Sequence, residues 1–119
     1  MPVRKILRAI RRAKPLTREE GMNILMRDRF QCQYCGLDGA ASLENGLMMT
    51  VDFIVPRALR GKKDPQNLVA ACRPCNLLKG RRRFASFEEA KKYVLARREE
   101  QRREWEKNVA LLRQQKATA

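Results

Sequence analysis

The sequence of 119 residues contains no histidine, which removes the side chain that most often serves as a general base near neutral pH. Acidic residues are also scarce: 13 Asp and Glu stand against 27 Lys and Arg, for a formal net charge of +14. No apolar run approaches the length of a membrane-spanning helix, and the N-terminus lacks the apolar centre of a secretory signal. We therefore expect a cytoplasmic, non-membrane chain whose partner is a polyanion, nucleic acid being the commonest. An acidic protein partner in an assembly would suit the same composition.

Four cysteines form two Cys-x-x-Cys pairs, Cys32 with Cys35 and Cys72 with Cys75. Four thiolates in two such pairs match the tetrahedral, all-sulfur coordination of a structural zinc site. A chain this short buries only a small core, so a bound metal is a reasonable source of stability. Two disulfides would need an oxidising compartment, and a redox role would need a thioredoxin-like pattern; the sequence supports neither. We predict structural zinc.

A short apolar run, Val51–Pro56, lies between the two cysteine pairs and carries one acid, Asp52. Residues 47–55 are apolar enough for one or two strands, whereas residues 36–46 are rich in Gly, Ala, Asp and Asn and predict a loop. Residues 56–65 predict an exposed basic loop. The expected arrangement is a zinc-stapled scaffold that holds a small polar site.

Helical patterns precede this central part. Residues 3–14 have apolar side chains at helical spacing among many basic ones, which predicts a basic helix or arm that stops at Pro15. The arm could lie along a phosphate backbone, or it could be an Arg-rich targeting segment or a flexible tail. Thr17-Arg18-Glu19-Glu20 has the form of a capping box, so a helix is expected from Arg18 to about residues 29–30.

Two further helices are expected after the second cysteine pair. A short one covers residues 76–83, and a capping box at Ser86–Glu89 opens a long one that runs to about residue 113. Between residues 97 and 107 the long helix is almost entirely charged. That part either projects into solvent or packs on a protein partner through Trp105, Val109 and Leu112.

These patterns predict an α+β fold in three parts. Residues 1–16 form the basic N-terminal arm, residues 17–84 form the small zinc-binding domain, and residues 85–119 form the long charged C-terminal helix and tail.

Three stretches stand in a fixed order: Arg27-Asp28-Arg29-Phe30-x-Cys32-x-Tyr34-Cys35-Gly36, Val51-Asp52-Phe53-Ile54-Val55-Pro56-Arg57 and Asn67-Leu68-Val69-Ala70-Ala71-Cys72-Arg73-x-Cys75-Asn76-x-x-Lys79-Gly80. Over about residues 18–83, this ordered set closely resembles the HNH endonuclease family. The resemblance implies a ββα-metal fold, in which a two-stranded hairpin and a helix clasp one divalent cation while four cysteines bind a separate zinc. It also implies metal-dependent cleavage of phosphodiester bonds in nucleic acid, most often DNA.

The resemblance assigns roles residue by residue. Asp52 is similar to the hairpin carboxylate that binds the catalytic cation, Asn76 is similar to the second protein ligand, and Asn67 is similar to the residue that holds the loop in shape. Two oxygen ligands with waters and a phosphate suit magnesium or manganese. The basic residues expected to contact backbone phosphates are Arg57, Lys79, Arg81, Arg82 and Arg83.

Phe53 is the departure from the family pattern. The family has a histidine at this position as the general base, and losing a positioned base costs on the order of 10²–10⁴-fold in rate. A metal-bound water could leave residual activity, whereas Tyr34 is a poor base at neutral pH. Other roles remain open: Asp52 could cap a turn or pair with Arg57, Asn76 could cap a helix, and Phe53 could be a core residue.

Three functions fit the sequence. The first is an HNH-type nuclease that is weak or uses an unusual base. The second is a nucleic-acid-binding module of the same fold that has lost cleavage. The third is a structural component of a larger nucleoprotein assembly that docks through its C-terminal helix.

Overall fold

The structure is a computed structural model of the chain, and it describes residues 13–118. The predicted basic arm therefore lies outside the described residues, apart from its last few positions. The elements, in chain order, are α2 (Arg18–Arg27), α3 (Leu43–Leu47), β1 (Met49–Phe53), the 3-10 turns η1 (Arg57–Leu59) and η2 (Pro65–Asn67), β2 (Leu68–Cys72), α4 (Arg73–Lys79) and α5 (Phe87–Thr118).

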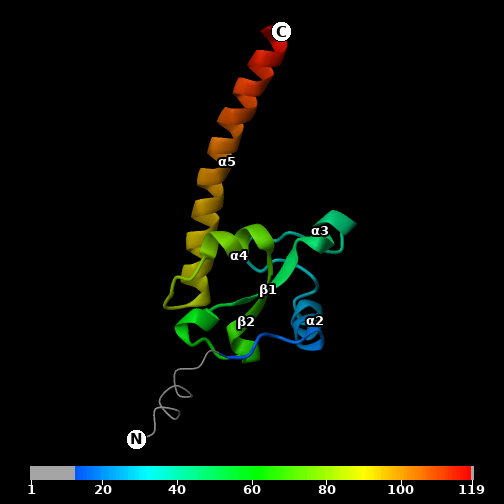
Figure 1. Cartoon of the computed structure of the whole chain (residues 1–119), viewed down its shortest axis with the longest axis vertical. Coiled ribbons are helices and arrows are strands. Elements are labelled where there is room, and N and C mark those ends of the chain that lie inside the picture. Colours follow the sequence, from blue (N-terminus) through cyan, green and yellow to red (C-terminus); the bar gives the residue numbers. More distant parts are fainter. Residues whose placement is uncertain (1–12, 119) are drawn as a thin grey trace, which may run out of the picture.

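A hairpin and a helix form the centre of the molecule (Figure 1). Strands β1 and β2 are antiparallel, with Met49 opposite Cys72 at one end and Phe53 opposite Leu68 at the other. Helix α4 begins at the residue that follows β2, so the order is strand, strand, helix. The predicted α+β fold with a ββα unit is confirmed.

Helix α2 begins where the capping box predicted. The Thr17 hydroxyl accepts a hydrogen bond from the Glu20 backbone N–H at 3.2 Å, and the Glu20 carboxylate accepts one from the Thr17 N–H at 3.0 Å. The helix ends at Arg27, two to three residues before the predicted end, because Arg29 and Phe30 adopt left-handed backbone conformations with φ of 57°. This turn directs the chain into the first cysteine pair.

Three other predicted boundaries were wrong. Residues 36–46 are not only loop: the Ser42 hydroxyl accepts a hydrogen bond from Asn45 N–H at 3.1 Å and so starts α3, which leaves only Met49–Phe53 for β1. Helix α4 begins at Arg73 rather than residue 76, because Pro74 suits a first helical turn. The helix ends at Lys79 rather than at residue 83, because the next residue, Gly80, has a φ of 64°.

Helix α5 runs to Thr118 rather than to residue 113, and no Gly or Pro interrupts it. Only its first turns belong to the core: Ala90 and Val94 are fully buried, and the Phe87 ring lies 5.2 Å from the Tyr34 ring, centroid to centroid. From there the helix extends far beyond the rest of the molecule (Figure 1), whose longest dimension is 71 Å. No helix among the described residues is long and apolar enough to cross a membrane.

Candidate metal centre and adjoining polar site

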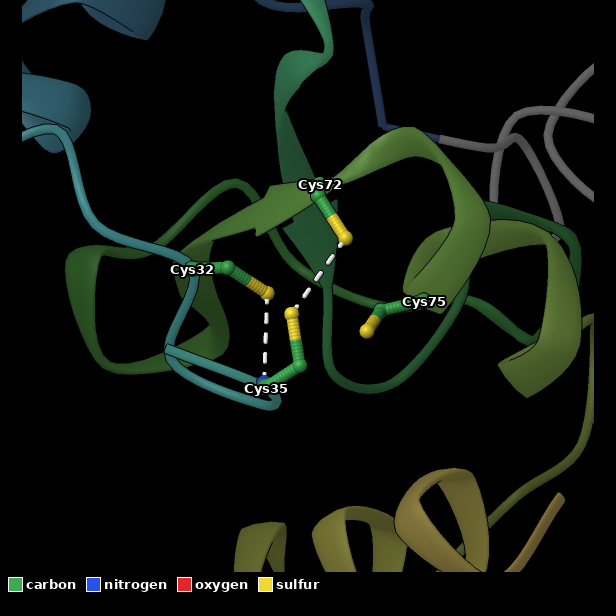
Figure 2. Close-up of side chains that lie close together, drawn as sticks. All are labelled: Cys32, Cys35, Cys72 and Cys75. Carbon is green, nitrogen blue, oxygen red and sulfur yellow. Dashed lines mark hydrogen bonds between the residues drawn. The ribbon is translucent and has the colours of Figure 1, made fainter. Parts of the chain in front are cut away.

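The four cysteine sulfurs lie close together, and their side chains point toward a common centre (Figure 2). Cys32 and Cys35 come from the loop after α2, Cys72 ends β2, and Cys75 lies in the first turn of α4. All four sulfurs lie within 4.8 Å of one another. A tetrahedral zinc ion with Zn–S bonds of 2.3 Å would separate its sulfurs by about 3.8 Å. The geometry therefore suits a bound metal such as zinc.

None of the four cysteines, all of which the structure describes, forms a disulfide. The sulfurs of Cys35 and Cys72 are 3.6 Å apart, far longer than an S–S bond. Hydrogen bonding to the Cys35 thiol lowers the pKa of Cys32 most, and hydrogen bonding to the Cys72 and Cys75 thiols lowers it further. By contrast, hydrogen bonding to Cys32 raises the pKa of Cys75. Four thiols this close together, three of them buried, cannot all ionise unless a cation balances their charge, and a bound metal such as zinc would supply it.

Arg98 of α5 adds a contact to this centre that the sequence did not suggest. Its Nη1 lies 3.6 Å from the Cys75 sulfur, and the side chain is half-buried. A guanidinium beside a metal-bound thiolate offsets part of the negative charge of a four-cysteine zinc site. The contact also ties the long helix to the metal centre.

Asp52 lies in the interior, one residue before the end of β1, with 4% of its surface exposed. Its Oδ2 accepts a hydrogen bond from the Tyr34 hydroxyl at 2.5 Å, and its Oδ1 lies 3.3 Å from the Lys79 Nζ. The same Nζ donates to the Phe53 carbonyl oxygen at 2.9 Å. Burial raises the pKa of Asp52, and the charge of Lys79 opposes that rise. Burial also raises the pKa of Tyr34, so its hydroxyl stays a proton donor.

The residues expected to hold a divalent cation do not fit that role as they are arranged. Both oxygens of Asp52 have partners, and the Lys79 ammonium already balances the charge of the carboxylate. Asn76, on α4, is half-buried, and its side-chain amide makes no hydrogen bond within residues 13–118. It is not a helix cap either, because Cys72 occupies that position. A cation could reach Asp52 only if Lys79 or Tyr34 gave up its contact.

The Phe53 ring lies away from the Asp52–Lys79 pair, although the Phe53 carbonyl oxygen accepts the hydrogen bond from Lys79. It lines a small hollow of about 290 Å³ together with Val51, Pro15 and Leu16. Arg57, at the edge of the hollow, donates from Nε to the Ala13 carbonyl oxygen at 3.0 Å. The ring thus lies beside apolar side chains in a hollow that Thr17 and Arg18 also line, and Arg57 does not pair with Asp52.

Asn67 holds the loop between the strands. Its Oδ1 accepts from the Val55 N–H at 2.8 Å, and its Nδ2 donates to the carbonyl oxygens of Val55 at 3.1 Å and Lys62 at 2.9 Å. Gly61 is buried in the same loop, where an added Cβ would lie 1.6 Å from the Val55 oxygen. The loop conformation therefore depends on an amide at 67 and on glycine at 61.

The five predicted phosphate-binding residues lie in three settings, and that of Arg57, half-buried and bound to the Ala13 carbonyl oxygen, is described above. Arg81, Arg82 and Arg83 are exposed in the turn after α4, and the Arg82 guanidinium lies over the Tyr93 ring, 4.8 Å from its centroid. Lys79 lies elsewhere: its side chain is buried and bound to Asp52, away from the surface in this conformation.

This geometry defines a class of protein: a small hairpin-and-helix domain with a four-cysteine metal centre. A comparison with models of protein families matches residues 32–82 to the family described as HNH endonuclease. Residues 32–82 thus match the HNH endonuclease domain, as the resemblance implied. Searches of curated proteins and of solved structures found no significant match.

Proposed function

We propose that this protein is a nucleic-acid-binding member of the HNH endonuclease family that does not hydrolyse its ligand. The observation that carries the proposal is the pairing of Asp52 with Tyr34 and Lys79. The family's cation ligand is thereby engaged in an internal ion pair. The position of the family's general base holds Phe53, and the chain has no histidine that could replace it.

Charge supports the binding half of the proposal. The chain has a formal net charge of +14, and Arg81–Arg83 form an exposed basic turn beside the ββα unit. Arginine side chains contact backbone phosphates without reading the base sequence. We propose duplex DNA as the ligand, with the arginine turn (Arg81–Arg83) as its main contact.

A titration of labelled duplex DNA at several salt concentrations tests this assignment. Substituting Arg81, Arg82 and Arg83 together by Gln should weaken binding and make the plot of log K against log salt shallower by about 0.9 for each lost phosphate contact. A matched control removes the same charge from the far end of α5 by substituting Lys107, Arg113 and Lys116 by Gln. Equal losses in the two variants, or no binding by the parent, would overturn the assignment.

Metal-dependent phosphodiester hydrolysis is the second candidate function. The free amide of Asn76 favours it, because a half-buried amide without a partner in the described chain suits a ligand. Manganese titration of the zinc-loaded protein, followed by electron paramagnetic resonance, separates the candidates. The main proposal predicts no stoichiometric manganese site. One ion per chain that is lost in Asn76→Ala, and retained in the exposed-helix control Asn108→Ala, would favour hydrolysis instead.

A further inference from the structure

An apolar groove lies between the first cysteine pair, α4 and α5. It has a volume of about 870 Å³, and its apolar lining includes Leu77, Leu95 and Trp105. Leu77 is 75% exposed and Trp105, the one tryptophan of the chain, is 60% exposed. Exposed apolar side chains that gather along a groove, with Arg98 and Arg102 at its edge, are typical of an interaction surface.

The same helix carries an apolar stripe beyond the groove. Trp105, Val109 and Leu112 are spaced by four and three residues, so they share one face of α5. Leu95 lies on the same face toward the start of the helix. These four apolar residues, together with Arg98 and Arg102, take the inner positions of a heptad pattern, which is the spacing of a helix that pairs with another. Leu111, also exposed, lies off this stripe.

Charge argues for a protein rather than a nucleic acid on this face. Residues 97–107 hold five basic side chains (Arg97, Arg98, Arg102, Arg103 and Lys107) and four acidic ones (Glu99, Glu100, Glu104 and Glu106). This near balance contrasts with the net charge of +14 for the whole chain. Four glutamates would repel a phosphate backbone, whereas a helix of mixed charge can lie against a second helix of the same kind.

We propose that the groove and the stripe bind each other across two copies of this chain, with the two α5 helices antiparallel. The heptad pattern then places Leu95 of one copy opposite Leu112 of the other, Arg98 opposite Val109, and Arg102 opposite Trp105. A two-fold axis near residues 103 and 104 repeats each contact. Leu112 of the second copy enters the groove near Leu77, and the Arg102 guanidinium packs on the Trp105 ring.

Sedimentation equilibrium of the zinc-loaded chain tests the proposal, and two adjacent leucines provide a matched comparison. Leu112→Glu puts a charge at a position that the interface uses twice, so the dimer dissociation constant should rise at least about tenfold. Leu111→Glu adds the same charge off the stripe and should change it less than about twofold. A parent that stays monomeric at several hundred micromolar, or two variants that dissociate equally, would overturn the proposal.

A distance measurement tests the orientation of the helices. In the antiparallel pair, residue 116 of one copy lies opposite residue 91 of the other, so two labels at 116 are separated by about 38 Å along the axis, at 1.5 Å per residue. Spin labels attached through Lys116→Cys, with the other cysteines protected by zinc, should report a distance near this value. A distance under about 20 Å would show parallel helices and contradict the proposed register.

Discussion

The buried pair of Asp52 and Lys79 yields a quantitative prediction about stability. Its two side chains are 4% and 0% exposed, respectively, and Lys79 joins the end of α4 to the end of β1. Removing one member leaves the other charged in the interior. Breaking a buried pair in this way typically costs about 3–5 kcal/mol, a large part of the 5–15 kcal/mol by which domains are usually stable.

A double-mutant cycle isolates the pair from its surroundings. Asp52→Asn and Lys79→Met should each lower the free energy of unfolding by about 3 kcal/mol or more, whereas the double variant should lie within about 1–2 kcal/mol of the parent. The hydrogen bond from Lys79 to the Phe53 carbonyl disappears both in Lys79→Met and in the double variant, so it cancels from the coupling energy.

Urea unfolding of the zinc-saturated protein, followed by circular dichroism, measures these values. The exposed pair of Arg97 and Glu100 on α5, which lies off the apolar stripe, serves as the control, and its cycle should give a coupling of about 0–1 kcal/mol. If the buried pair gave a coupling as small as the exposed one, Lys79 would not balance the charge of Asp52. The reason for excluding a divalent cation from that carboxylate would then fail.

Three further predictions concern the metal and the loop. Chelation should release one zinc per chain, measured by mass spectrometry, and unfold the ββα unit, because structural zinc contributes directly to folding; retained near-ultraviolet dichroism would contradict this. Gly61→Ala should destabilise the chain by about 1–3 kcal/mol through overpacking. By contrast, Gly21→Ala, whose Cβ would lie 4.0 Å from Val51 Cγ2 in ordinary contact, should be neutral or stabilise α2 by up to about 1 kcal/mol; thermal melts that rank them otherwise would refute the loop geometry. Asn67→Ala should speed amide exchange at Val55, while an unchanged rate would mean that the loop holds without the Asn67 side chain.

The local features of the chain were predictable from the sequence. The spacing of Cys32 and Cys35 and of Cys72 and Cys75 brings two ligands together within each turn, so the metal centre needed little knowledge of the fold. The capping box at Thr17–Glu20 determined the start of α2 by contacts between neighbours in the sequence. The order of the family motif then supplied the hairpin and helix that join the two cysteine pairs.

The chemistry around Asp52 was not predictable, because it depends on contacts between residues far apart in the sequence. Tyr34 and Asp52 are 18 residues apart, and Lys79 and Asp52 are 27 apart. Lys79 has the sequence context of a surface residue, next to Arg81–Arg83, and only the packing of α4 on the hairpin turns it inward. Arg98 is likewise 23 residues from Cys75 and outside the family match.

Incubating the zinc-loaded chain with supercoiled plasmid, in magnesium and then in manganese, tests whether the protein binds DNA without cleaving it. We expect the protein to retard the plasmid at low salt and the plasmid to remain supercoiled. Nicked circles that accumulate with the parent and disappear with Asn76→Ala would contradict this expectation, and would make this chain a nuclease that works without histidine.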